Sequence, residues 1–290
     1  MTDRLAVAKT FKLYIAGAFP RSESGRSEVI AGADGRVVGH ACRASRKDLR
    51  DAVVAARKAL GGWANATPYL RGQILYRMAE MLEGKRAEFE GLLAQTEPPA
   101  PGRPDARTQV TLAVDRLVAF AGWADKYHHV LGCQNGVSAP YWNITVPEPT
   151  GVIGVVCPPS SALLALVSLL APVVCTGNAA VVISPASPAV VSVFGEVCAT
   201  GDLPGGVVNL LTGSAEELVP HLARHRDVDG VCAADCPPGL EREIRLGTAD
   251  NMKRTSLRRG VDWSDPTSCH GPGWLEPFVE FKTVWHPIGA

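Results

Sequence analysis

Short apolar runs alternate with longer apolar segments between residues 151 and 233. Four short runs rich in valine, isoleucine and leucine indicate strands: Gly151–Cys157, Ala179–Ile183, Val207–Leu211 and Val228–Cys232. The intervening segments place apolar residues at helical intervals: Leu163–Cys175, Ala189–Thr200 and Ala215–Ala223. Strands that are nearly continuously apolar and alternate with helices form parallel sheets covered on both faces. We therefore predict an α/β fold, a doubly wound parallel sheet with right-handed crossovers.

No charged residue lies between Glu148 and Glu196, so a membrane span must be considered. A spanning helix needs roughly 20 consecutive apolar residues. Pro158–Ser161, Pro172 and Gly177–Asn178 divide this region into pieces shorter than that. The pattern therefore predicts buried strand–helix–strand units and no interaction with a membrane.

The N-terminal region carries the signals of a small separate sheet. Leu13–Phe19 alternates between apolar and polar positions, and Val29-Ile30 is followed closely by Val37-Val38. Asp34-Gly35 between the latter two runs is a hairpin signal. We expect a two- or three-stranded antiparallel start.

Capping signals and apolar stripes indicate helices in the first half. Ser45 with Asp48 three residues later resembles a capping box, and an apolar stripe follows it. Thr67-Pro68 opens the next helix. The prolines of Glu97–Pro104 interrupt all periodicity and predict a loop, after which Thr108–Tyr127 is again helical.

Two alternating segments at distant places in the chain have the pattern of exposed strands. They are Tyr141–Val146, directly before the apolar region, and Phe278–Trp285 near the C-terminus. Such strands could pair as a protruding ribbon, and strand edges of this kind often recruit another subunit. Residues 247–277 lack a clear pattern, and we interpret them as an irregular connector.

Composition narrows the classes of partner and compartment. Among the 290 residues, lysine plus arginine equals aspartate plus glutamate at 29 each, which gives a formal net charge of zero. That balance argues against nucleic acid and anionic membranes as partners. The first residues, Met1–Leu5, lack the apolar stretch of a signal peptide, so we expect a cytoplasmic protein.

The cysteines and histidines do not indicate a metal site. Most of the eight cysteines lie in apolar segments, where a thiol behaves as a small buried hydrophobe. Cys232 and Cys236 lack a second pair at zinc spacing. His221 and His225 have the spacing of two ligands on one helix face, but no acidic motif accompanies them. We therefore expect no metal.

Several short motifs, in order and spacing, resemble the aldehyde dehydrogenase superfamily. They are Tyr14-Ile-Ala-Gly, Phe120-Ala-Gly-Trp-Ala-Asp125, Glu148-Pro-Thr-Gly-Val-Ile-Gly-Val-Val-Cys-Pro158, Leu170-Ala-Pro, Asp202-Leu-Pro-Gly-Gly-Val-Val-Asn209, Thr212-Gly213 and Asp227-Val-Asp229. The resemblance covers Leu13 to about Arg245 and resumes at Phe278–Trp285. It implies a Rossmann-like cofactor domain, a catalytic domain inserted after it, and an oligomerisation ribbon.

On this basis the chain divides into five parts. These are the N-terminal strands and helices of the cofactor-type domain (1–136), a ribbon strand (137–149), the Rossmann-like core (150–246), an irregular connector (247–277) and a C-terminal ribbon strand (278–290). The connector stands where active members have most of their catalytic domain, so we expect that domain to be largely missing.

The motifs that carry the family's chemistry are altered. That chemistry needs a cysteine thiolate, an amide donor for the oxyanion, a glutamate base and a nicotinamide cofactor. Ser160 stands where active members have the asparagine of Cys-Pro-Trp-Asn-Phe-Pro, and Ile183 where they have a ribose-binding lysine. Ala233–Gly239 replaces Gly-Ser-Thr-x-x-Gly with a run that contains Asp235 and two prolines.

No candidate nucleophile is supported. The Glu-Leu-Gly-Gly and Gly-Gln-x-Cys motifs have no match, and we assign no catalytic residue. Cys269, followed by His270, is interpreted as a spectator thiol because no motif surrounds it. An intact scaffold with altered chemistry resembles the second, truncated unit of the family-16 aldehyde dehydrogenases.

Our leading hypothesis is therefore a non-catalytic structural or regulatory subunit. The alternatives are an oxidoreductase that binds the dinucleotide and takes its nucleophile from another chain, and a dehydrogenase that uses Cys269. We expect no cofactor. If NAD or NADP binds, the positions to inspect are Val156, Pro158, Ser160 and Ile183, around the turn after the first core strand.

The resemblance also predicts an oligomer. Without the catalytic domain, the C-terminal edges of Gly151–Cys157 and Ala179–Ile183 would expose apolar surface unless another segment packs there. Trp142 and Trp285 in the ribbon belong to a residue type favoured as an interface anchor. We expect a hetero-oligomer with a full-length aldehyde dehydrogenase, or else a homo-oligomer.

Overall fold

A five-stranded parallel sheet forms the centre of the chain in the computed structural model, which describes residues 7–265, 267 and 269–289. The strands are β6 (Val152–Val156), β7 (Ala179–Ser184), β8 (Val208–Thr212), β9 (Gly230–Ala234) and β10 (Arg254–Arg258). Their spatial order is β10-β9-β6-β7-β8. Numbered along the chain, this is the 3-2-1-4-5 order of a doubly wound dinucleotide-type sheet. The predicted fold class is confirmed.

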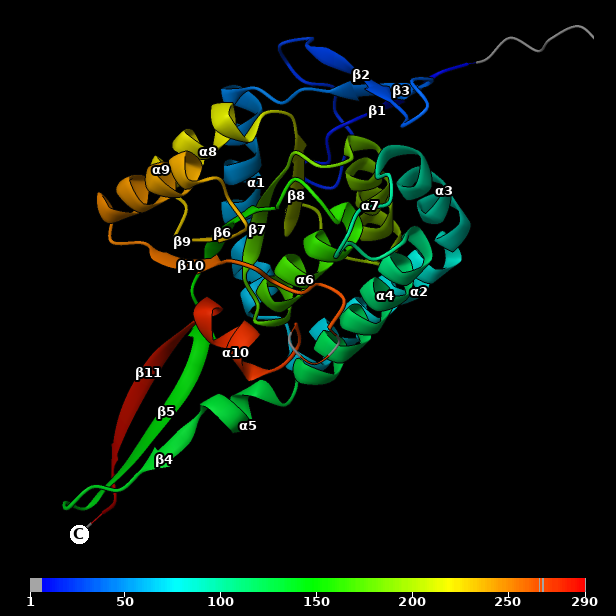
Figure 1. The fold of residues 1–290 in the computed structure, drawn as a ribbon. Coiled ribbons are helices and arrows are strands. Elements are labelled where there is room, and N and C mark those ends of the chain that lie inside the picture. The colour runs from blue at the N-terminus through cyan, green and yellow to red at the C-terminus, as the bar shows by residue number, and fades with distance from the viewer. Residues whose placement is uncertain (1–6, 266, 268, 290) are drawn as a thin grey trace, which may run out of the picture.

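Helices cover both faces of the sheet (Figure 1). One face packs against α6 (Ala162–Cys175) and α7 (Pro188–Thr200), and outside these lie α2 (Pro68–Gly84), α3 (Arg86–Thr96) and α4 (Ala106–Trp123). The other face packs against α1 (Arg46–Ala64), α8 (Ala215–Arg224) and α9 (Pro238–Ala249). Each face has its own continuous apolar cluster.

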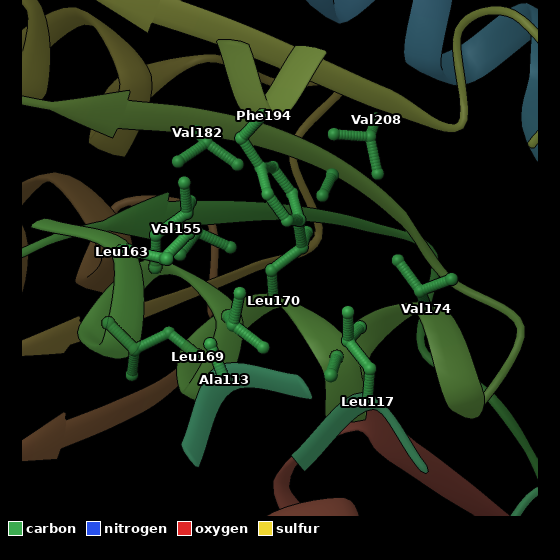
Figure 2. Close-up of a cluster of buried hydrophobic side chains, with 14 of the residues drawn as sticks. Ala113, Leu117, Val155, Leu163, Leu169, Leu170, Val174, Val182, Phe194 and Val208 are labelled. Atoms are coloured by element: carbon green, nitrogen blue, oxygen red, sulfur yellow. The ribbon is translucent and has the colours of Figure 1, made fainter. Parts of the chain in front are cut away.

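Helix α6 explains the long uncharged region of the sequence. It lies between α4, which contributes Ala113 and Leu117, and the strands that carry Val155 and Val182 (Figure 2). Every residue of α6 is buried, so no position on it faces water. The helix has 14 residues, and among the described residues none of the helices is long and apolar enough to cross a membrane.

Side-chain caps start three long helices, at Ser45 and Thr67 as the sequence indicated and at Asp105, where it gave no cap signal. Ser45 accepts hydrogen bonds from the backbone of Lys47 and Asp48, and the Asp48 carboxylate accepts from the Ser45 backbone at 2.8 Å. Thr67 caps α2, with proline at the first helical position, and Asp105 caps α4. These bonds satisfy backbone donors that the helix itself leaves free.

The N-terminal sheet differs in part from the expectation. It contains β1 (Lys9–Phe11), β2 (Ser27–Ala31) and β3 (Val37–Cys42) in the order β1-β3-β2. The β2–β3 hairpin is antiparallel as predicted, but β1 runs parallel to β3. Leu13–Phe19 is not a strand of this sheet, because Tyr14 bridges to Leu210 at the edge of the central sheet.

The ribbon predicted from the two distant strands is present. β5 (Tyr141–Pro149) pairs antiparallel with β11 (Val279–Pro287) along its whole length. A third strand, β4 (Cys133–Asn135), follows α5 (Tyr127–Leu131) and pairs with the other edge of β5. Figure 1 shows the ribbon extending away from the helices and the central sheet.

Residues 247–277 are not irregular throughout, which corrects the sequence interpretation. They contain β10, which pairs parallel with β9, then α10 (Pro272–Leu275), and the one-turn helix η1 (Glu276–Phe278) begins at their end. The strand Arg254-Thr-Ser-Leu-Arg258 was missed because it lies at the sheet edge and none of its residues is fully buried. An edge strand of this kind lacks the apolar pattern that identifies interior strands. Pro266 and Ser268 lie outside the described residues.

Candidate functional site

In a sheet with this strand order, a ligand site is expected at the carboxyl ends of β6 and β9. These two strands are neighbours, with Val156 beside Ala233, and the chain leaves them in opposite directions along the sheet. The turn after β6 leads through Ser160 and Ser161 into α6, and the turn after β9 leads through Asp235 into α9. Any dinucleotide bound in the manner of this fold would lie across these turns.

The four positions proposed for cofactor contact meet at this edge, but only one of them reaches solvent. Val156 is paired with Ile183, and both side chains pack in the cluster beneath α1 and α8, at 1% and 0% exposure. Pro158 is buried and Ser160 is partly exposed. Ile183 is thus part of the sheet interior and presents no group to a ligand.

The turn after β9 offers few donors for a phosphate. Helix α9 begins at Pro238, directly after Pro237, and has no side-chain cap. Because neither proline has an N–H, the end of this helix lacks donors that an anion would bind. Asp235, in a left-handed conformation with φ 49°, accepts a hydrogen bond from the backbone of Gly260 at 2.7 Å. Its carboxylate therefore holds the connector against β9.

The connector after β10 is fastened to the sheet and to the helices. Arg259 donates to the Glu241 carboxylate at 2.5 and 2.9 Å, and the bonds from Arg259 and Arg245 lower the pKa of Glu241. Arg258 stacks on the Trp274 ring, 3.8 Å from its centroid. In Figure 1 the segment after β10 passes in front of α6 toward α4. The apolar surface expected at this edge is covered by the chain itself.

A second segment, the proline-rich loop after α3, closes the start of α6. The Glu97 carboxylate accepts a hydrogen bond from the Ala162 backbone at 2.8 Å and another from the Gln109 side chain at 3.0 Å. The neighbouring Thr96 hydroxyl lies 2.6 Å from that of Ser187, where α7 begins. Sequence analysis placed a loop here but gave no signal that Glu97 would reach α6.

The residues at this edge do not fit a nicotinamide dinucleotide. Ile183 cannot donate to ribose, α9 begins with prolines, and the Ala162 N–H already has a carboxylate partner. A cleft of about 590 Å³ lies between the two covering segments. It is lined by Gly102, Arg103, Pro104, Thr108, Gly260, Val261, Asp262 and Ser264. None of the four proposed cofactor positions is among these lining residues.

Of the thiols near the edge, Cys269 and Cys232 are buried and Cys236 is half-buried. Cys269 is 0% exposed and packs with Trp263 and Trp274, and its Sγ donates to the Asp262 carbonyl at 3.6 Å. Burial raises the pKa of the Cys232 thiol to about 12 and that of Cys236 to about 11. A group of three His, Cys, Asp or Glu side chains able to hold a metal does not occur among the described residues.

Comparison with known proteins gives a consistent answer over most of the chain. Residues 19–260 match the model of the aldehyde dehydrogenase family. The Bacillus subtilis protein DhaS, which carries the description of an aldehyde dehydrogenase, is 30% identical over 259 residues, covering 87% of this chain and 50% of that protein. Cytosolic 10-formyltetrahydrofolate dehydrogenase of Xenopus laevis is 29% identical over 265 residues, covering 89% of this chain and 29% of that protein.

Solved structures agree. The NAD⁺ complex of an aldehyde dehydrogenase from Bacillus cereus superimposes with a TM-score of 0.79 at 25% identity, covering 87% of this chain and 51% of that one. An Escherichia coli NADP-dependent enzyme shares the fold with a TM-score of 0.80 at 20% identity, covering 87% of this chain and 52% of that one. The chain thus spans about half the length of these structures. Over that half, both sequence and fold match, and the chain belongs to the aldehyde dehydrogenase family.

Proposed function

We propose that this chain is a non-catalytic aldehyde dehydrogenase homologue that acts as a structural or regulatory subunit of an active aldehyde dehydrogenase. The observation that carries the proposal is the covered edge of the sheet, where the connector and residues 96–104 lie. The only cysteine of the connector, Cys269, is fully buried. We infer that the chain alone binds no NAD or NADP and oxidises no aldehyde.

The ribbon supports association with a partner. In the β5–β11 pair, Val284 lies opposite Ile144, and Trp142 follows on the same face of the ribbon. All three side chains are between 40% and 53% exposed. The opposite face carries hydrogen bonds that join Asn135 to Thr145 and Thr145 to Thr283, and it also carries the exposed aromatic side chains of Tyr141, Phe281 and Trp285. An isolated ribbon without a buried face is marginally stable in water, so we infer that the face with Trp142, Ile144 and Val284 is covered by another subunit.

The partner we favour is a full-length aldehyde dehydrogenase, and a second copy of this chain is the alternative. In either case, the edge strand of this ribbon would pair with the edge strand of the partner's ribbon through main-chain hydrogen bonds. Light scattering after size-exclusion chromatography, for the chain alone and after co-expression with a full-length aldehyde dehydrogenase from the same source, separates the two. A monomer in both experiments would refute the proposal.

Matched ribbon variants identify the face. Val284→Asp places a charge beside Ile144 and Trp142 and should weaken association at least tenfold, a cost of about 1.4 kcal/mol. Thr283→Asp makes the same charge change on the opposite face and should have a smaller effect. Equal effects of the two substitutions would mean that the face with Val284 is not the contact.

The rival function is an oxidoreductase that binds the dinucleotide here and takes its nucleophile from another chain. It is favoured by the NAD⁺ bound in the Bacillus cereus structure. Calorimetric titration with NAD and NADP, together with steady-state assays on several aldehydes, decides between the two functions. Micromolar binding without turnover by the purified chain would support the rival, and turnover by the purified chain would instead point to a dehydrogenase with its own nucleophile.

A further inference from the structure

The first turn of α6 carries the partial positive charge of a helix N-terminus, and a distant segment of the chain supplies its hydrogen-bond acceptor. Ser161, the residue before the helix, makes no side-chain capping hydrogen bond. The first N–H groups of a helix have no partner within the helix and favour a negative charge. Glu97, 65 residues earlier in the chain, supplies that charge through its 2.8 Å contact with the Ala162 N–H.

The second carboxylate oxygen is held from another helix. Gln109, in α4, is 1% exposed, and its amide nitrogen donates to Glu97 at 3.0 Å and to the Pro104 carbonyl at 3.3 Å. Its amide oxygen is buried and has no hydrogen-bond partner among the described residues. Donors from α6 and α4 therefore converge on one carboxylate, in the arrangement that a small oxyanion would need.

The segment that carries Glu97 is tied down on both sides. Thr96 contacts Ser187 at the start of α7, so consecutive residues reach the first turns of both helices that follow β6 and β7. Four prolines lie between residues 98 and 104, and proline reduces the number of conformations that a loop can adopt. The contact is therefore held in place by the fold.

We propose that Glu97 is an internal anion and that residues 96–104 form a built-in plug, which keeps dinucleotide phosphates away from the start of α6. This inference rests on the function proposed above, since it explains why the chain would bind no cofactor. It adds that the obstruction is a specific carboxylate contact, separate from the loss of the lysine at Ile183.

Chemical rescue tests the contact. Glu97→Ala should lower the melting temperature by about 3–8 °C, because a charged hydrogen-bond acceptor is lost between two buried donors. Sodium formate at ten times its dissociation constant should then raise the melting temperature of this variant by about 2–3 °C relative to sodium chloride at equal ionic strength. Formate should not stabilise the native chain.

Glu90→Ala is the matched control, because Glu90 is a carboxylate of α3 whose ion pair is with Arg86. It should show neither the loss nor the rescue. Glu97→Gln should lie between the native chain and Glu97→Ala in melting temperature, because its single amide oxygen can accept from the Ala162 N–H or from the Gln109 amide, and its NH2 group cannot accept from the other donor. Equal formate responses of Glu97→Ala and Glu90→Ala, or an unchanged melting temperature in Glu97→Ala, would overturn the plug.

Hydrogen exchange of the native chain gives a readout that does not depend on a variant folding. The Ala162 amide should exchange at least tenfold more slowly than an unbonded amide, and rapid exchange would overturn the plug. If the native chain binds NAD while the Ala162 amide stays protected, the proposal that the chain binds no cofactor is refuted, and the proposal of the plug is not. If NAD removes the protection, the plug itself is refuted.

Discussion

The guanidinium of Arg116, in α4, donates a hydrogen bond to the backbone carbonyl of Trp263, in the connector. It also donates to the Ser168 hydroxyl in α6. Arg116 is 2% exposed, and burial lowers the pKa of its guanidinium. One buried cation thus joins two helices to the connector, and the connector is part of the core.

Replacing Arg116 by methionine should therefore destabilise the whole chain. The substitution keeps an unbranched side chain but leaves the Trp263 carbonyl without its charged donor. We expect the free energy of unfolding to fall by about 2–3 kcal/mol, measured by urea denaturation. Arg107→Met on the same helix is exposed and should stay within about 0.5 kcal/mol. Similar losses from both substitutions would contradict this role.

Restoring the family's lysine at position 183 should fail to restore a cofactor site. Ile183 is 0% exposed between the sheet and α1, so Ile183→Lys buries a charge and should cost at least about 3 kcal/mol of stability. Ile183→Val keeps the apolar character and should cost about 0.5–1.5 kcal/mol. Urea denaturation measures both changes. A stable lysine variant that binds NAD would show that this side chain can reach the crevice.

Alkylation should distinguish the exposed thiol from the buried ones. Iodoacetamide at pH 8 should modify Cys133, on the outer ribbon strand, before any other cysteine. Cys236 should react slowly, because burial raises its pKa to about 11, and Cys269 only after unfolding. Mass spectrometry of tryptic peptides gives the order. Rapid labelling of Cys269 in the native chain would revive its candidacy as a nucleophile.

The connector should loosen in acid. Hydrogen bonds from Arg259, and then Arg245, depress the pKa of the Glu241 carboxyl in the folded state. Its contribution to stability is therefore complete above the unfolded value of about 4.3 and is lost as the pH falls through the lower folded value. The melting temperature of Glu241→Gln should vary less with pH than that of the native chain below about pH 4.3. Parallel curves would show that this ion pair does not stabilise the fold.

The central sheet could be predicted from the sequence because its interior strands are buried on both faces. Val152–Val156 and Ala179–Ser184 are fully buried, and their residues have the continuous apolar character that this position requires. β10 could not be found in this way, because it pairs with a strand on one side only and its residues are exposed or half-buried. The short strand β4 was missed for the same reason.

The sequence alone could identify the candidate site only as a set of positions where the family's functional residues are replaced. The sequence placed Ser160, Ile183 and Asp235 near one edge, and the structure brings them there. The contacts that cover this edge join residues far apart in the chain: Glu97 with Ala162, and Asp235 with Gly260. No local pattern encodes such contacts, since they depend on where the loops cross the folded sheet.

Along the sequence, most of the α/β core lies between the ribbon's two long strands. Thr145 and Thr283, which are hydrogen-bonded across these strands, are 138 residues apart. Thr150 and Phe278, at the ribbon's base, are also joined through their backbones at 3.2 Å. The strands can meet only after the intervening chain has brought their ends together, and closing so large a loop is slow. Completed pairing of β5 and β11 therefore indicates that the core between them has folded. A subunit recruited through this ribbon would select finished molecules, so assembly itself would serve as a check on folding.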